Sequence, residues 1–262
     1  MNFSSLIDQI PQWLFILLYS VPPLLLMWLV HLGFQKFAPH WELKDRDENM
    51  ASGGVASVAA LTGVVLAFVL ALANQAIDTY QNNVSIEASQ LRSMDKFLLA
   101  TQAPDSLQCR QSLLTYANSI VNDEWPQLKF QKGSIKTYTL LSAFEKCLIS
   151  VQPTTPAQAS IYIETLKLSN QIAESRETRI SNSANVLSNV FWEVIHIGLL
   201  LTIILAALSF YTPGKIRVIN CTIQIIALSI LIALVMLLDH PFTGTNNVSN
   251  AAIIETIAHI KP

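Results

Sequence analysis

Four long stretches of this sequence contain no Asp, Glu, Lys or Arg. They are residues 9–35, 49–77, 194–214 and 218–238, and each is at least 21 residues long. A helix needs about 20 mostly apolar residues to cross the hydrocarbon of a bilayer. The sequence therefore predicts an all-α membrane protein with four transmembrane helices, and it excludes a soluble enzyme.

The remaining composition narrows the function further. Only 13% of the 262 residues are charged, and the formal net charge is −2, whereas nucleic-acid-binding domains are strongly basic. The sequence therefore predicts the lipid bilayer as a partner and predicts no binding of nucleic acid. No nucleophile–base set, phosphate loop or Cys/His ligand spacing occurs, and Glu193-x-x-His196 is a single pair where a di-metal helix bundle needs two. We therefore expect no enzyme activity, no metal and no cofactor.

The order of apolar and polar segments predicts the domain organisation. Residues 1–54 hold the N-terminal tail, the first transmembrane helix and a short charged loop, and residues 55–74 form the second transmembrane helix. Residues 75–190 form a helical extramembrane domain inserted between spans two and three. Residues 191–247 hold the third and fourth transmembrane helices, and residues 248–262 form an amphipathic tail that could lie at the membrane interface or pack on the inserted domain.

Proline, glycine and capping residues divide the inserted domain into helices. No Pro or Gly occurs between Ile77 and Ala100, so the second span should continue outward as one long helix. Ser134 and Thr155 are predicted N-caps, the latter before Pro156. From Pro156 to Gly198 the chain again lacks both residue types, which predicts a last helix that runs straight into the third span.

The orientation can be predicted from basic residues and cysteines. The two short loops contain five Lys or Arg residues and the two tails contain only Lys261, so the positive-inside rule places the loops in the cytoplasm and the inserted domain outside. Cys109 and Cys147 lie in that domain and could pair only in an oxidising compartment. Cys221 lies in the fourth apolar run, where a packing role is expected.

The second span has a face of small residues at helical spacing. This face consists of Ala56, Ala60, Gly63, Ala67 and Ala71 and ends at Asn74. Small residues let another helix approach closely. The face is either a packing seam within one protomer or a surface that lines a pore or joins subunits.

Two further groups of polar residues are predicted to lie close together, because their distances from the ends of the transmembrane helices are similar. Glu87 lies about 20 Å beyond the end of span two, at 1.5 Å per residue, where Arg176 and Arg179 are expected on the antiparallel partner. A Glu87–Arg179 or Glu87–Arg176 pair would act as a structural brace. The second group, at the ends of spans two, three and four, either lines an ion entrance or marks the boundary between lipid and water. This polar boundary cluster consists of Asn74, Asp78, Glu193, His196 and Asp239.

Several short motifs resemble those of the bacterial membrane proteins with a bestrophin-like domain. They occur in order over roughly residues 50–250. They are Ala67-Phe68, Glu87-Ala88 with Leu91, Tyr116, Glu124-Trp125-Pro126, Arg176-x-x-Arg179-Ile180, Phe191-Trp192 and Leu238-Asp239-His240-Pro241-Phe242-x-Gly244.

This resemblance implies a function. Bestrophins are pentameric anion channels with four spans per subunit and a pore lined by span two. The resemblance therefore implies a homo-oligomeric channel for inorganic anions in the bacterial inner membrane, with Val64, Phe68 and Leu72 as a hydrophobic constriction. The alternative is a non-conducting membrane scaffold or sensor whose helical domain binds a partner. Bestrophins place the domain between spans two and three in the cytoplasm, the opposite side from the one that the basic residues favour here.

Overall fold

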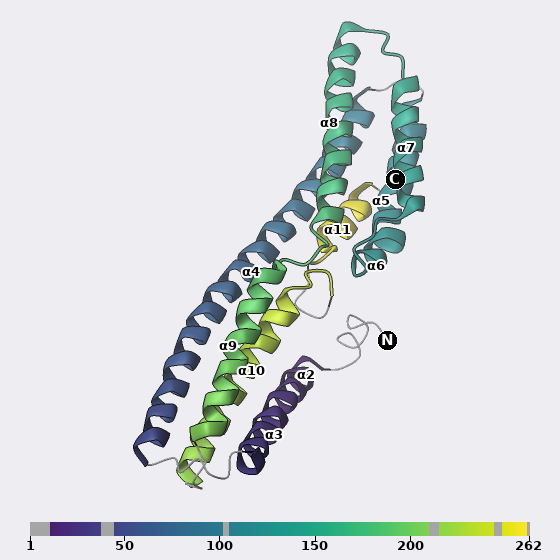
Figure 1. Cartoon of the computed structure of the whole chain (residues 1–262). Coiled ribbons are helices and arrows are strands. Elements are labelled where there is room, and N and C mark those ends of the chain that lie inside the picture. Colours follow the sequence, from purple (N-terminus) through teal and green to yellow (C-terminus); the bar gives the residue numbers. More distant parts are fainter. Residues whose placement is uncertain (1–10, 38–44, 102–104, 210–214, 244–247, 261–262) are drawn as a thin grey trace. The chain divides into compact units, whose positions relative to one another are not determined.

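The structure, a computed structural model, is helical with no strand over the residues that it describes (Figure 1). These are residues 11–37, 45–101, 105–209, 215–243 and 248–260. Four helical stretches are long and apolar enough to cross a membrane, namely Gln12–Lys36, Met50–Thr101, Asn189–Ser209 and Lys215–Leu238. The predicted all-α fold with four long apolar helices is confirmed, and the chain is a membrane protein.

The chain divides into two compact units. The membrane unit contains the chain up to Gln75 and Val186–Asp239, and the helical domain contains Ala76–Asn185 and the C-terminal helix. Helix α4 (Asp45–Thr101) is 57 residues long and contributes to both units. The expectation that the second span continues outward as one helix agrees with this length.

The membrane unit is built from apolar helices packed around a main core and a smaller cluster of Phe15, Ala233 and Leu237. Its other helices are α2 (Gln12–Tyr19), α3 (Val21–Phe37), α9 (Asn189–Ser209) and α10 (Lys215–Leu238). Met27 of α3, Leu66 of α4, Ile203 of α9 and Ile232 of α10 are buried in this core. The first span breaks at Ser20, and Pro22 and Pro23 lie in the first turn of α3, where proline is tolerated because the backbone N–H groups there have no partner within the helix.

Helices α4 and α9 approach each other closely at a glycine. A Cβ atom at Gly198 would lie 2.5 Å from Oγ1 and 2.9 Å from Cγ2 of Thr62. Only a residue without a side chain fits this contact, which is the usual way in which transmembrane helices pack tightly.

The helical domain has a separate core. Besides the second part of α4 it contains α5 (Ser106–Ser119), the π-helical segment η1 (Ile120–Glu124), α6 (Trp125–Leu128), α7 (Ile135–Ser150), α8 (Pro156–Ser181) and α11 (Ala251–Ile260). Ser134 and Thr155 cap α7 and α8 by accepting hydrogen bonds from the backbone N–H groups of Thr137 and Gln158. Both predicted caps are confirmed.

The helix that was expected to run from Pro156 into the third span is interrupted. Helix α8 ends at Ser181 and α9 begins only at Asn189. The side chain of Asp239 accepts a hydrogen bond at 2.7 Å from the backbone N–H of Leu187 in the connecting segment. The prediction of one continuous helix was wrong. A lack of Pro and Gly permits a helix but does not enforce one, and here the carboxylate of Asp239 binds the backbone N–H of Leu187 in place of a helical carbonyl oxygen.

The C-terminal tail is part of the helical domain. Ile253, Ile257 and Ile260 of α11 are buried in the domain core, together with Leu91 of α4 and Leu113 of α5. Of the two alternatives for this tail, packing on the inserted domain is the one that the structure shows.

Candidate functional site

Helix α4 presents an uncovered apolar face in the membrane unit. The side chains of Leu61, Val64 and Phe68 are 70%, 69% and 60% exposed, and they recur every three to four residues. Leu72, one turn further on, is half-buried. The opposite face of the helix carries Leu66 and is packed into the core. Two of the three predicted constriction residues therefore lie on a surface that the described part of this protomer leaves open.

The predicted small-residue face lies on the same open side. Its alanines at positions 56, 60, 67 and 71 are all exposed, and Gly63 is half-buried with no atom within 4 Å of where its Cβ would lie. Within the described residues, this face is therefore not a packing seam inside one protomer. It is open to contact with lipid or with another subunit.

The exposed faces of the other membrane helices differ from this one. Helix α9 exposes Val194, Ile197 and Leu200, and α10 exposes Ile219 and Ile223. Large aliphatic side chains of this kind suit contact with lipid tails, whereas small residues are enriched where transmembrane helices meet. Among the described membrane helices, α4 is thus the one whose exposed face combines a row of small residues with large apolar side chains.

The predicted polar boundary cluster does not share one environment. Asp239 is buried, and its carboxylate accepts hydrogen bonds from the backbone N–H of Leu187 and, at 3.1 Å, from Nε1 of Trp192. Glu193 and His196 are exposed on α9, and Nδ1 of His196 lies 2.6 Å from the carbonyl oxygen of Trp192. Asp239 therefore acts as a structural acceptor that holds the start of α9.

The two remaining members of that cluster lie on α4. Asn74 and Asp78 are both exposed. Their positions follow the open apolar face along the helix, so the polar end of this face is formed by an amide and a carboxylate.

A buried network of four charged residues lies inside the helical domain. Arg179 of α8 donates to both oxygens of Glu87 at 2.7 and 3.1 Å, and to Oε2 of Glu124 at 2.9 Å. Arg176 pairs with Glu124, whose Oε1 also accepts the backbone N–H of Ser134. All four charged side chains are at most 5% exposed. The network is neutral overall, with two Arg and two Glu residues, which is the condition under which buried charges are tolerated.

The surroundings of the network hold Arg179 charged. Burial by itself would lower the pKa of Arg179, but the charge and hydrogen bond of Glu87 outweigh it and raise the pKa above its usual value. Burial and the charge of Glu87 also raise the pKa of the Tyr116 hydroxyl well above its usual range. Nη1 of Arg179 and the Tyr116 hydroxyl are buried and have no hydrogen-bond partner among the residues that the structure describes.

Backbone geometry brings Glu124 into the network. Glu124 is the last residue of the π-helical segment η1. Helix α6 follows directly and has Pro126 in its first turn. At Gly133 a Cβ would lie 2.8 Å from Cδ1 of Ile180 and 3.3 Å from Nη2 of Arg176. The glycine therefore permits the close approach of the loop before α7 to the charged network.

The sequence predicted part of this network. The Glu87–Arg179 pair was expected from helix heights and is present, whereas Arg176 pairs with Glu124 rather than with Glu87. Glu124 was not predicted as a partner, although it belongs to the motif Glu124-Trp125-Pro126. A π-helical turn and a loop separate Glu124 from its partners. Its position relative to Arg176 and Arg179 therefore could not be calculated from the rise per residue of a single helix.

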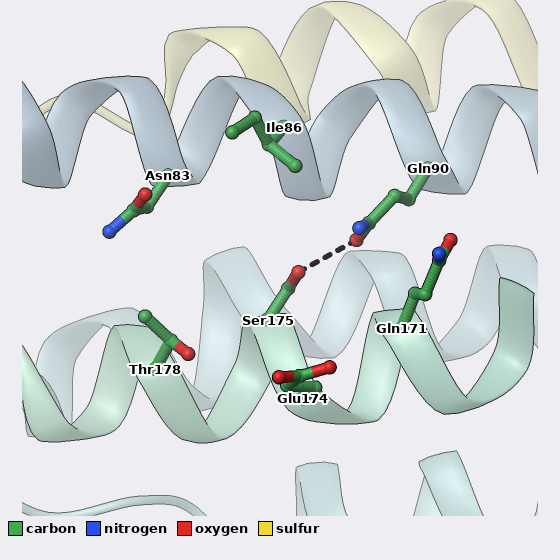
Figure 2. A pocket seen from close by; sticks show the side chains of 7 residues that line it. All are labelled: Asn83, Ile86, Gln90, Gln171, Glu174, Ser175 and Thr178. Carbon is green, nitrogen blue, oxygen red and sulfur yellow. Dashed lines mark hydrogen bonds between the residues drawn. The ribbon is translucent and has the colours of Figure 1, made fainter.

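A polar groove runs between α4 and α8 within the helical domain (Figure 2). Its volume is about 260 Å³. Ser175 donates a hydrogen bond to the side-chain oxygen of Gln90 across it. The lining is formed by amides, hydroxyls, one carboxylate and one isoleucine: Asn83, Ile86, Gln90, Gln171, Glu174, Ser175 and Thr178. Within the described ranges, no group of three or more His, Cys, Asp or Glu residues is placed to hold a metal ion.

Comparison with known proteins assigns the family. The sequence model of the Bestrophin-like domain matches residues 9–253. The fold is similar to that in a crystal structure of a single-substitution variant of a bacterial bestrophin homologue from Klebsiella pneumoniae, with a TM-score of 0.51, 14% identity and 94% of each chain covered. No curated protein matches the sequence. The fold and its four apolar helices define a membrane protein of the bestrophin type. The chain belongs to the Bestrophin-like domain family, as its motifs predicted.

Proposed function

We propose that this protein is a homo-oligomeric ion channel for anions, located in a bacterial inner membrane. Several copies of α4 would surround the pore, and Phe68, with Val64 and Leu72, would form a hydrophobic constriction. Asn74 and Asp78 would line one entrance. The observation that carries the proposal is the open face of α4, where small residues alternate with Val64 and Phe68.

The physical argument has two parts. Small residues allow identical helices to approach closely around an axis, and a ring of apolar side chains can close a pore by excluding water. Membership of the Bestrophin-like domain family supports the channel class. The preference for anions follows from the resemblance to bestrophins.

Ion flux in liposomes tests the proposal. The purified protein should pass chloride in preference to potassium, and Phe68→Ala should raise the flux several-fold because it widens the constriction. Ile223→Ala removes an equally exposed apolar side chain from α10 and is the matched control, with flux close to that of the unaltered protein. If folded, reconstituted protein passes neither ion, or if Phe68→Ala and Ile223→Ala behave alike, the proposed constriction is wrong.

A second candidate function is a membrane scaffold or sensor whose helical domain binds a partner. The polar groove between α4 and α8 favours it, since the amides and hydroxyls of Gln90, Gln171 and Ser175 could bind a polar segment of a partner. A monomer or dimer in mild detergent would support this function over the channel, because neither can enclose a pore of the pentameric kind.

A further inference from the structure

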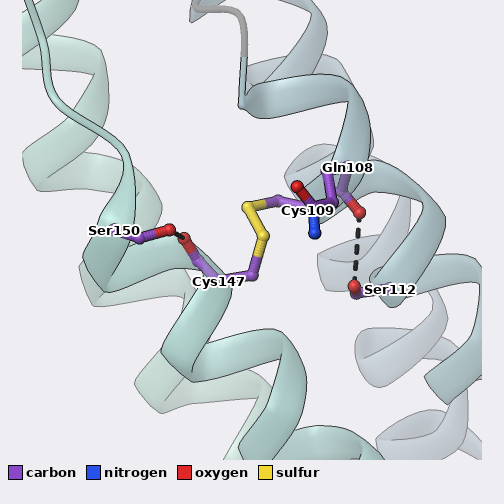
Figure 3. Close-up of a disulfide and its surroundings, with 5 residues drawn as sticks. All are labelled: Gln108, Cys109, Ser112, Cys147 and Ser150. Carbon is purple, nitrogen blue, oxygen red and sulfur yellow. Dashed lines mark hydrogen bonds between the residues drawn. A yellow bond between two sulfur atoms is a disulfide. The ribbon is translucent and has the colours of Figure 1, made fainter.

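A disulfide bond joins α5 to α7 inside the helical domain (Figure 3). It links Cys109 to Cys147, which are 38 positions apart in the sequence and have Cα atoms 5.4 Å apart. Cys109 is completely buried and belongs to the domain core. The folded domain thus places these two thiols within bonding distance and holds them there.

The third cysteine is in a different situation. Cys221 of α10 is free and buried in the membrane unit, with its sulfur 3.1 Å from the hydroxyl oxygen of Ser209. It does not compete for a disulfide partner. The pairing of Cys109 with Cys147 is therefore unambiguous.

The chain returns to one side of the membrane after its fourth span. Helix α11, which follows α10, is packed in the same domain core as Leu91 and Leu113. Among the described residues, two helices long and apolar enough to cross a membrane, α9 and α10, lie between the main part of the helical domain and α11. Two crossings bring the chain back to the side from which it started, so this core fixes α9 and α10 as a membrane hairpin.

The basic residues differ between the two sides of the membrane. The short segments between α3 and α4 and between α9 and α10, with the adjoining helix ends, contain Lys36, Lys44, Arg46, Lys215 and Arg217. The N-terminal tail contains no Lys or Arg, and the segment after α10 contains only Lys261. Short loops that are rich in Lys and Arg remain in the cytoplasm.

We infer that the helical domain faces the oxidising, non-cytoplasmic side of the membrane, and that Cys109–Cys147 is a permanent structural disulfide there. Stable disulfides form in oxidising compartments and are rare in the cytosol. The two thiols would lose two protons and two electrons to the disulfide of a thiol–disulfide oxidoreductase, which becomes a dithiol as the Cys109–Cys147 bond forms. The disulfide and the basic residues lead to the same orientation independently, and the inference holds whether or not the protein conducts ions.

Thiol trapping tests the disulfide in the full-length protein. In a Cys221→Ala variant expressed in bacteria, free thiols are first blocked under denaturing conditions, and the sample is then reduced and treated with a maleimide–polyethylene glycol. We expect a gel shift of two polymer chains in a host with the oxidoreductase, and loss of that shift in a host that lacks it. Thiols that are already blocked before reduction in the first host would overturn the inference.

A second experiment measures the orientation without altering the disulfide. One cysteine is added to the Cys221→Ala background in each of two variants, Ser160→Cys in α8 and Lys215→Cys at the start of α10, both exposed positions, while Cys109 and Cys147 remain. A membrane-impermeant maleimide added to intact spheroplasts should label the α8 variant at once and the α10 variant only after permeabilisation. The opposite pattern would place the helical domain in the cytoplasm, as in bestrophins.

Discussion

The buried hydroxyls of the membrane helices and the buried charges of the helical domain find their hydrogen-bond partners in different ways. In the membrane unit, the buried hydroxyls of Thr62, Thr202 and Ser229 each donate to the carbonyl oxygen four residues earlier in the same helix. In the helical domain, Arg179 and Glu87 bind each other across two helices. A hydrogen bond within one helix does not constrain how that helix packs against its neighbours. The charged network, in contrast, fixes the register of α4 against α8. We conclude that charge pairing fixes the helix register in the helical domain, whereas the membrane unit combines close packing at Gly198 with the hydrogen bonds of Asp239 to the start of α9.

The largest expected effect comes from breaking the charged network. Arg179→Met removes both ion pairs of Arg179 and leaves Glu87 buried without a partner, which should lower the free energy of unfolding by about 3–5 kcal/mol. Glu177→Gln is the control, because Glu177 is 71% exposed and contacts only the edge of the network at Arg176. Thermal unfolding in detergent, followed by circular dichroism, measures both. Equal midpoints for the two variants would show that the network does not determine stability.

A smaller effect is expected where the membrane helices meet. In Gly198→Ala the new Cβ overlaps Thr62, and overpacking of this kind costs about 1–3 kcal/mol. Gly33→Ala in α3 is the control, since no atom lies within 4 Å of a Cβ there. Adding Thr62→Ala to Gly198→Ala should restore the thermal midpoint. A double variant as unstable as the single one would show that the loss has another cause.

The smallest effect concerns Tyr116. Tyr116→Phe removes a buried hydroxyl that has no partner among the described residues, so the stability should stay within about 1 kcal/mol of the original, on the stabilising side. Because burial raises the pKa of Tyr116 in the folded state, the hydroxyl ionises first in the unfolded chain, and the folded state therefore loses stability as the pH rises above about 10. Tyr116→Phe should therefore be less sensitive to alkaline pH. Clear destabilisation at neutral pH would mean that the hydroxyl has a bound partner.

The sequence was sufficient for features that depend on one helix at a time. Charge-free runs located the four apolar helices, single residues such as Ser134 identified helix caps, and residue counting placed Glu87 level with Arg179. Each of these follows from periodicity or from the rise per residue.

Features that need several elements at once were not predictable. Glu124 reaches the network through a π-helical turn, and Asp239 interrupts the chain before α9 from a position 52 residues beyond Leu187. The sequence left the pairing of Cys109 with Cys147 open because it depended on the side of the membrane. It also left two interpretations of the small residues on α4, because only the packed structure shows which face of that helix is already covered.

The accessibility of Phe68 to water tests most directly whether the open face of α4 lines a pore. Phe68→Cys and, as a control, Ile223→Cys are made in the Cys221→Ala background and reconstituted in liposomes. A charged, water-soluble methanethiosulfonate should react at position 68 and reduce chloride flux, and it should leave the flux through the α10 variant unchanged. If the reagent leaves the flux of the Phe68→Cys protein unchanged when added on both sides, α4 does not line a conducting pore.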